Sequence, residues 1–411
     1  MRSKTRLDDL AIFGSPPAFL EPLHVGRPNI GDREAFLTRV KALLDRRWLT
    51  NNGPFVQELE RRIADRVGVE HCVAICNGTI ALELAIRAAG LTGEVIVPSF
   101  TFVATVHALS WHGITPVFCD VNSRNHTIDH ERIEELITPR TTGIIGVHLW
   151  GRACDVSQLA DIAARHRLTL LFDAAHAFGC SYEGTMIGNF GAAEVFSFHA
   201  TKFMNSFEGG AVVTNDGDLA RKIRLMANFG FAGHDHVVTI GTNGKMTEIA
   251  AAMGLTSLDS MDDFIHVNLA NLEEYERRLR DTPGVALLPY DQREKGNYQY
   301  VIAYVDDSVA GLSRDNLLDV LWAENVLARR YFYPGSHRME PYHYDFPDAH
   351  RRLPNTDRLS RSVLALPTGT AVGPDEIRGI CDIIRCAQAH APEVRTQLDQ
   401  NDGGGSARHP R

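Results

Sequence analysis

The sequence predicts an α/β protein whose larger domain is built on a mostly parallel β-sheet. Between residues 70 and 215, short apolar runs rich in β-branched residues alternate with segments of helical character. The apolar runs are nearly continuous, which is typical of strands covered by helices on both faces. The composition, with 44% hydrophobic and 23% charged residues among 411, is that of a globular protein with a large core.

Seven strands are expected in this domain. Five alternate with helices, and they are Cys72–Cys76, Glu94–Val97, Thr115–Asp120, Thr142–Leu149 and Leu168–Asp173. The helices between them are Ala81–Ala89, Phe102–Trp111, Glu131–Ile137 and Val156–His166. The last two strands, Ala193–Phe198 and Gly210–Asn215, have no full helix between them, which indicates an added pair.

A second, smaller α+β domain is expected after a charged connecting helix. Helices at Asp218–Asn228, Glu248–Ser260 and Leu269–Arg280 precede a strand at Tyr298–Val305 and a helix at Arg314–Glu324. A loop rich in Pro, His and Tyr at 331–350 and a closing helix at Glu376–Ala389 follow. We expect a large domain with an N-terminal segment over 1–265 and a small domain over 266–395. A disordered tail is expected over 396–411.

Charge and cysteine content exclude several classes of protein. The 42 basic and 51 acidic residues give a net charge of −9, which disfavours a nucleic-acid partner. Seven cysteines without a Cys-x-x-Cys pair indicate neither disulfides nor zinc, and a reducing cytoplasm fits them best. The uncharged stretch 95–119 is long enough to span a membrane, but its prolines and histidines favour buried elements instead. No histidine spacing indicates a metal site.

Asn77-Gly78-Thr79 forms a turn between a strand and a helix. Glycine lets the backbone approach a ligand, and the free N–H groups of a helix start favour an anion such as phosphate. An ordinary helix cap is the simpler explanation when the turn is considered alone.

Two ionisable residues follow apolar strands further along the chain. Asp173 ends the run Leu-Leu-Phe-Asp, at the end of a strand where open α/β sheets bind ligands, and His176 comes three residues later. Lys202 lies among apolar residues such as Phe203 and Phe207, and desolvation in such surroundings makes a lysine nucleophilic. A turn-capping aspartate and a solvated lysine are the ordinary alternatives.

Together these residues match the requirements of pyridoxal 5′-phosphate (PLP). The cofactor needs a lysine for a Schiff base and a carboxylate that keeps its pyridine nitrogen protonated. It also needs a phosphate cup and an aromatic face. The candidates in that order are Lys202, Asp173, the cup of Gly78, Thr79 and Ser197, and Phe102.

From about Trp48 to the closing helix, the chain resembles the DegT/DnrJ/EryC1/StrS family of PLP-dependent sugar aminotransferases of fold type I. The motifs that carry the resemblance are WLTNNGP at 48–54, CNGTIALELA at 76–85, PSFTFVAT at 98–105, PVFCDV at 116–121, GVHLWG at 146–151, FDAAHAFG at 172–179, FSFHATKF at 196–203 and EGGAVVTND at 208–216.

The resemblance implies the cofactor roles given above and a homodimer with shared active sites. It places His176 beside the cofactor as a positioning and stacking residue, and it brings Asn243 of a second subunit to the phosphate. Lys245 stands where the family more commonly has arginine. The candidate substrate ligands are Thr50, Asn51, Tyr331, His337 and Arg338, and the pair Arg329-Arg330 is a further candidate for a nucleotide diphosphate.

The sequence TNGKM at 242–246, with NYQYVI at 297–302 and CDIIR at 381–385, is most similar to one branch of the family. That branch comprises the TDP-4-keto-6-deoxyglucose 4-aminotransferases of actinobacterial deoxyaminosugar pathways, which contribute to antibiotic biosynthesis. The resemblance therefore implies that L-glutamate aminates TDP-4-keto-6-deoxy-D-glucose to TDP-4-amino-4,6-dideoxy-D-glucose. From the cysteine pattern and the residues of 95–119, we expect a cytoplasmic protein without a membrane partner.

Three alternatives remain open. One is amination at C3 of a TDP-3-keto sugar, because no residue here distinguishes C4 from C3. A second is a PLP-dependent sugar dehydratase, although the family's dehydratases carry histidine at the position of Lys202. The third is a regulatory protein that acts on transcription, which the net charge of −9 disfavours.

Overall fold

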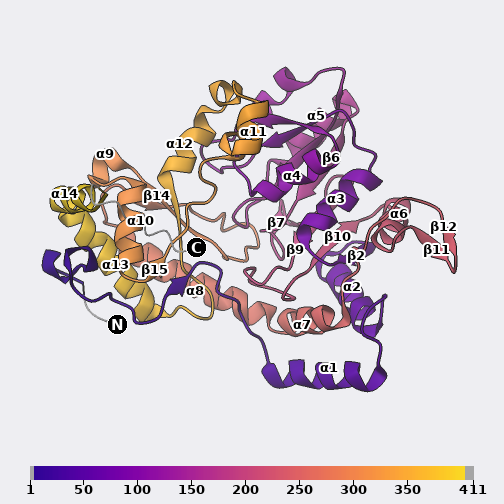
Figure 1. The fold of residues 1–411 in the computed structure, drawn as a ribbon, viewed down its shortest axis with the longest axis horizontal. Helices are drawn as coiled ribbons and strands as arrows, with labels where there is room; N and C mark the ends of the chain where they lie inside the picture. The colour runs from indigo at the N-terminus through magenta and orange to yellow at the C-terminus, as the bar shows by residue number, and fades with distance from the viewer. Residues whose placement is uncertain (1–3, 403–411) are drawn as a thin grey trace.

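The computed structural model describes residues 4–402 as two domains joined by a long helix. Figure 1 shows the large domain in indigo to magenta and the C-terminal domain mainly in orange and yellow. Helix α8 (Met261–Leu279) runs from one domain to the other.

The central sheet of the large domain has seven strands in the order β2-β10-β9-β6-β5-β3-β4. All neighbours pair in parallel except β10, which is antiparallel to both β2 and β9. The expected α/β fold with a mostly parallel, seven-stranded sheet is thereby confirmed. The strands are β2 (His71–Ile75), β3 (Glu94–Pro98), β4 (Thr115–Cys119), β5 (Thr141–Val147), β6 (Thr169–Asp173), β9 (Ala193–Ser197) and β10 (Gly210–Thr214).

Strands β9 and β10 pair with each other, as the missing helix between them predicts, and they lie inside this sheet between β2 and β6. Every residue of β10 is buried, which only an interior strand of small and β-branched residues allows. Small hairpins lie outside the sheet, namely β7 (Ser181–Tyr182) with β8 (Thr185–Met186) and β11 (Phe231–Gly233) with β12 (His236–Val237).

Helices cover both faces of the sheet, as the apolar strands predict. One face packs against α3 (Gly78–Ala88), α4 (Val103–Trp111) and α6 (Gly217–Ala227). The other packs against α2 (Pro54–Val67), α5 (Val156–His166) and α7 (Glu248–Asp259). Where one helix was expected at 131–137, two 3₁₀ turns, η3 (His130–Arg132) and η4 (Glu134–Leu136), occur instead. Ile133 and Leu136 are both buried, and their spacing of three suits a 3₁₀ turn.

The C-terminal domain contains the antiparallel sheet β13-β14-β16, formed by Val285–Leu287, Val301–Val305 and Val363–Leu366. Its helices are α9 (Asp307–Ala310), α10 (Arg314–Ala323), α13 (Pro374–Ala389) and α14 (Ala391–Asp402). Helix α14 includes residues 396–402, which we expected in a disordered tail, because Val394 and Leu398 pack one turn apart into this core. The remainder of the expected tail, 403–411, lies outside the described residues.

The N-terminal segment, which we grouped with the large domain, packs on the C-terminal domain instead. Its turns η1 (Leu7–Asp9) and η2 (Ala11–Phe13) lead to β1 (Leu23–His24), which pairs with β15 (Val326–Leu327). The buried Glu324 explains this placement. Its carboxylate lies 3.0 Å from the Lys4 amine and accepts hydrogen bonds from the backbone amides of Ala11 and Ala18.

In return, a segment of the C-terminal domain packs on the large domain. The expected loop at 331–350 contains η5 (Ser336–Arg338) and α11 (Glu340–Asp345), and η6 (Ala349–Arg352) and α12 (Pro354–Ser362) follow. Tyr342, Ala349 and Leu353 are buried in the same core as α3 and α4. Figure 1 shows α11 and α12 in orange beside the large domain. Residues 329–333 therefore cross between the domains.

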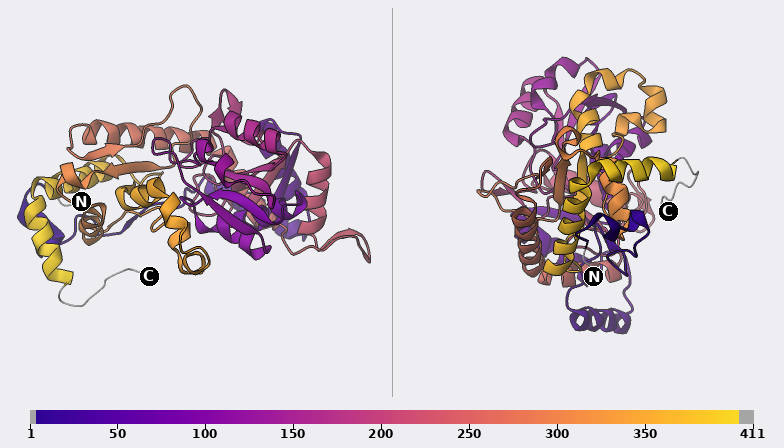
Figure 2. Two further views of the ribbon diagram at one scale, coloured as in Figure 1. Left: turned by 90° about the horizontal axis from the view of Figure 1, so that it is seen from above. Right: turned by 90° about the vertical axis from the view of Figure 1, so that its left-hand side faces the viewer.

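Two elements stand away from the body of the chain. Helix α1 (Arg33–Arg46) lies apart from the sheet in Figures 1 and 2, and the β11–β12 hairpin projects beyond α6. Both regions carry exposed apolar side chains, among them Leu37, Leu44, Phe229, Phe231 and Val237.

All seven cysteines are free thiols. No helix within residues 4–402 is both long and apolar enough to cross a lipid bilayer.

Candidate active site

The carboxyl ends of the central strands open into a cavity of about 650 Å³. The start of α3, the ends of β6 and β9, the loop after β9 and residues of the C-terminal domain line it. A volume of this size suits a cofactor or a small substrate. The cavity brings together eight of the thirteen predicted site residues, namely Gly78, Thr79, Phe102, Asp173, His176, Ser197, Lys202 and Tyr331.

The start of α3 lies against the end of β9, where the sequence predicts a phosphate cup. Asn77 caps the helix by accepting a hydrogen bond of 2.8 Å from the amide of Ile80, and Gly78 and Thr79 line the cavity. A Cβ atom on Gly78 would lie 3.0 Å from Cβ of Ser197, so a side chain there would crowd this approach. Free amides at a helix start beside a serine hydroxyl suit a phosphate.

Asp173 ends β6 as a buried carboxylate. It accepts hydrogen bonds from the Thr105 hydroxyl at 2.8 Å and the Ala175 amide at 3.0 Å. Within residues 4–402 no lysine, arginine or histidine nitrogen lies within ion-pair distance of it. Burial raises the pKa of this carboxyl, although the two hydrogen bonds and the charge of Lys202 oppose that rise. A buried acid on a cavity wall is stabilised by a cationic partner inside the cavity.

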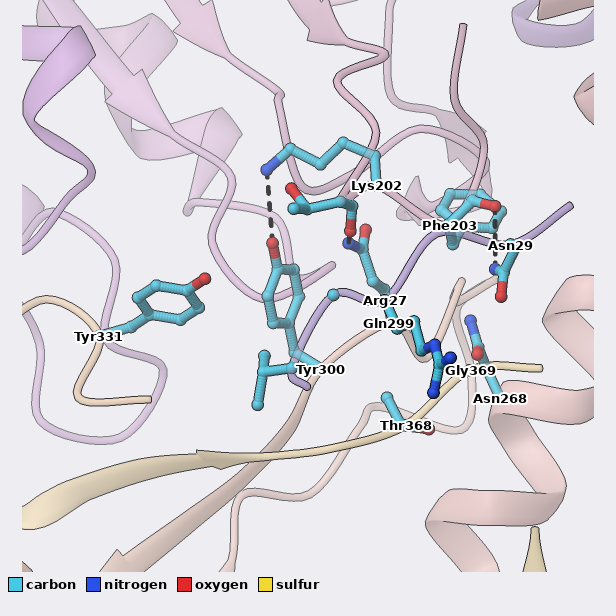
Figure 3. Close-up of a pocket in the computed structure, with 13 residues that line it drawn as sticks. Arg27, Asn29, Lys202, Phe203, Asn268, Gln299, Tyr300, Tyr331, Thr368 and Gly369 are labelled. Carbon is cyan, nitrogen blue, oxygen red and sulfur yellow. Dashed lines mark hydrogen bonds between the residues drawn. The ribbon is translucent and has the colours of Figure 1, made fainter. Parts of the chain in front are cut away.

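Lys202 contributes an amine to the same cavity. Its Nζ donates a hydrogen bond of 3.4 Å to the Tyr300 hydroxyl, as Figure 3 shows. The side chain is partly accessible, but dense packing around its amine lowers the pKa to about 8, an effect that Asp173 partly offsets. A much larger fraction of this amine is therefore neutral at neutral pH than for an ordinary lysine, and only a neutral amine attacks a carbonyl.

The pKa of Lys202 gives a pH dependence for covalent capture of PLP by the cofactor-free protein. Because only the neutral amine reacts with an aldehyde, we expect the capture rate to rise with pH and to reach half its maximum near pH 8. Stopped-flow absorbance measures this rate. A midpoint near the ordinary lysine pKa of about 10.4 would show that the amine is not desolvated.

An aromatic wall surrounds His176. Its ring stacks on Trp150, with centroids 5.7 Å apart, and lies 4.4 Å from the ring of Tyr300. Burial and the nearby charge of Lys202 hold the pKa of His176 well below its usual value, so the imidazole is neutral. This environment suits a residue that packs beside a planar ligand and does not suit a proton donor.

Three predicted site residues lie on the exposed surface, outside this cavity. Thr50 and Asn51 belong to the loop between α1 and α2, and Asn243 follows the β11–β12 hairpin. The cavity of their own chain does not include them.

His337 and Arg338 also lie outside the cavity, and the structure gives a physical reason for each. His337 is buried, with its Nδ1 atom 2.7 Å from the Ser99 hydroxyl oxygen. The Arg338 guanidinium donates to both carboxylate oxygens of Asp357, with an Nε–Oδ1 distance of 2.7 Å. Both side chains are engaged within the chain in this arrangement, and their predicted substrate roles stay predictions.

The structure adds cavity residues that sequence reasoning missed or left open. Tyr300 and Phe332 come from the C-terminal domain, where no local pattern indicates them. His148 lines the cavity and lies 3.1 Å from the buried Glu194, and its place at the end of an apolar strand was an available signal. Arg329, left open as a diphosphate ligand, also lies on the cavity wall.

Comparisons with known proteins agree with this arrangement. The model of the DegT/DnrJ/EryC1/StrS aminotransferase family matches residues 31–385. A dTDP-4-amino-4,6-dideoxy-D-glucose transaminase of Shigella dysenteriae is 37% identical over 367 residues, which are 89% of this chain and 99% of the relative. A GDP-perosamine synthase of Caulobacter vibrioides is 35% identical over 327 residues, 79% and 87% of the two chains.

A solved structure of DesI in the presence of its TDP-sugar product superimposes with a TM-score of 0.90. It is 49% identical and covers 96% of this chain and 100% of the other. The family match and these identities, together with the lysine, aspartate and predicted phosphate cup around one cavity, define the class of enzyme. The chain belongs to the DegT/DnrJ/EryC1/StrS aminotransferase family and is a PLP-dependent sugar aminotransferase.

Proposed function

We propose that this chain aminates C4 of TDP-4-keto-6-deoxy-D-glucose, with L-glutamate as donor, to give TDP-4-amino-4,6-dideoxy-D-glucose. The observation that carries the proposal is the shared cavity of Lys202, Asp173 and Gly78. The similarity to DesI and to the Shigella dysenteriae transaminase supports the TDP-linked substrate and its C4 position.

The residues present fit PLP. The predicted cup of Gly78, Thr79 and Ser197 would hold its phosphate, and Asp173 would pair with its pyridine nitrogen. No cationic nitrogen within residues 4–402 lies within ion-pair distance of Asp173, which leaves its carboxylate available for that pairing. When bound, PLP supplies an electron sink that stabilises a carbanion at the carbon attached to the amine. Phe102, which is 57% exposed on the cavity wall, is available to pack against its ring.

Lys202 moves the protons. As a neutral amine it would remove the α-proton of the bound glutamate, and as an ammonium it would serve as the acid that gives the proton back. The same transfers in reverse deliver the amine to the sugar carbon. The hydroxyl of Tyr300, which accepts a hydrogen bond from Nζ, orients the amine between transfers. Asp173 would keep the pyridine nitrogen of PLP protonated, because a carboxylate close to that nitrogen favours its charged form.

The chemistry alone does not select C4 over C3, since the amine reacts with any carbonyl that reaches it. The carbon is selected by the way in which the rest of the nucleotide sugar is held. The dehydratase alternative requires a different residue in place of Lys202 and therefore has no support in this site.

The test is product analysis. We expect the PLP-loaded protein to convert TDP-4-keto-6-deoxy-D-glucose and glutamate into a sugar with its amine at C4, with one 2-oxoglutarate formed per sugar. NMR of the purified product places the amine. A product with its amine at C3, or reaction only with a 3-keto sugar, would contradict the proposal.

We also infer a homodimer in which each chain completes the site of the other. Asn243 lies exposed outside its own cavity, as do Thr50 and Asn51, so all three are available to a second copy. Exposed apolar residues of α1 and of the projecting β11–β12 hairpin support such a contact, since their exposure in a single chain is unfavourable. The Lys245 amine lies 4.4 Å from the ring centroid of Phe229 and donates a hydrogen bond to the Asn228 side chain. These two contacts stabilise the segment that leads into the hairpin.

A further inference from the structure

A second hollow of about 560 Å³ adjoins the active-site cavity. The two share part of their walls, namely Val25, Phe102, Arg329, Tyr331 and Phe332, so they are contiguous. The wall of the second hollow is mainly apolar and aromatic, with Leu327, Tyr333 and Met339 among its residues. Its position beyond the shared wall makes it the natural extension of the active site for a long substrate.

Arg329 is the cation at the junction of the two hollows. Its backbone is fixed by paired hydrogen bonds with Ala365, of 3.0 and 2.9 Å. Its side chain is exposed, and the guanidinium lies over the ring of Tyr331 with 5.5 Å to the centroid. Among residues 4–402, no carboxylate lies within ion-pair distance of this guanidinium.

The neighbouring arginines each have a carboxylate partner, although Arg314 and Arg330 share one. Asp315 binds Arg314 at 2.9 Å and Arg330 at 3.2 Å. Asp357 binds Arg338 through both carboxylate oxygens. Arg329 is therefore the arginine at the boundary between the hollows whose guanidinium has no carboxylate partner among residues 4–402.

We propose that Arg329 binds the diphosphate of the nucleotide sugar and that the second hollow receives the nucleoside. This inference rests on the proposed function. In a pyranose, C1 and C4 lie on opposite sides of the ring, so a sugar whose C4 faces Lys202 directs its C1 diphosphate away from that amine. An arginine there recognises phosphate oxygens by paired hydrogen bonds, and an aromatic wall beyond it suits a planar base.

The test uses the PLP-loaded protein and TDP alone as the probe. We expect Arg329→Gln to weaken TDP binding by about 10- to 100-fold in calorimetry, the cost of losing hydrogen bonds to a charged group. Arg329→Lys should recover part of the loss, because lysine keeps the positive charge but lacks the paired N–H donors of a guanidinium. Thymidine, which lacks the diphosphate, should bind both proteins equally. The control Arg351→Gln changes an exposed arginine on η6, outside both hollows, and should leave TDP binding unchanged.

A kinetic measurement separates this inference from the proposed function. In Arg329→Gln, the KM for the nucleotide sugar should rise by a similar factor, while the yield and rate of 2-oxoglutarate from glutamate in the absence of sugar stay as in the wild type. Unchanged TDP affinity in Arg329→Gln, in a protein that retains PLP, would overturn the inference and leave the proposed function standing. Wild-type protein that binds TDP through Arg329 but does not aminate the TDP-keto sugar would overturn the proposed function alone.

Discussion

Replacing Lys202 with alanine is expected to lower kcat by about 10⁴-fold or more, because one side chain supplies both the bond to PLP and the proton transfers. Formation of 2-oxoglutarate from glutamate measures the loss in the first half of the reaction. After borohydride reduction, mass spectrometry should find PLP attached to the wild-type protein and not to Lys202→Ala. Full turnover by this variant would contradict the assignment of Lys202.

Two further variants serve as controls for this experiment. Lys202→Arg keeps a positive charge in the cavity but remains protonated at working pH, so it should be as inactive as the alanine variant. Lys222→Ala removes an exposed lysine of α6 and should leave both turnover and the PLP adduct unchanged. The comparison separates loss of the neutral amine from loss of charge.

Replacing Asp173 with asparagine is expected to lower kcat by about 10²- to 10³-fold, the effect of removing one preorganised electrostatic partner from an active site. Asparagine has nearly the same shape, so the fold should persist. It carries no charge, so it cannot keep a pyridine nitrogen protonated. The absorption spectrum of the bound cofactor should change, and equilibrium dialysis should show weaker retention of PLP.

The matched control is Asp161→Asn, which removes an exposed carboxylate of α5 and should alter neither the spectrum nor the rate. Unfolding followed by circular dichroism checks that Asp173→Asn retains its structure. A folded variant with wild-type kcat and an unchanged spectrum would show that Asp173 has no electrostatic role in the reaction.

Of the predicted residues that line the cavity, all but Tyr331 come from the large domain. Gly78, Asp173, Ser197 and Lys202 lie next to the ends of apolar strands, and such strands are recognisable from local composition alone. In a parallel sheet the carboxyl ends of neighbouring strands meet at one edge, so residues far apart in the chain are brought together there. The motifs shared with the family added the chemical role of each.

The part that was missed or left open depends on contacts between domains. Tyr300 lies 98 residues after Lys202, and no periodic pattern connects the two. Arg329 and Arg338 look alike as sequence, and both were candidates for contact with the nucleotide sugar. Only the packing of α12 beside η5 shows that Asp357 occupies the Arg338 guanidinium and that no carboxylate faces Arg329.

By itself, the sequence determined the α/β class and the parallel sheet. It also predicted the lysine, the aspartate and the phosphate cup that line one cavity, since each lies within a few positions of a strand end. The tertiary structure alone decided which segments cross between the domains. It showed that Glu324 holds the N-terminal segment on the C-terminal domain and that Tyr342 and Leu353 fix residues 336–353 on the large one. Burial and charge pairing between residues so far apart in the sequence depend on the whole packed chain. Folding decides which side chains become neighbours, and therefore which charged groups find a partner.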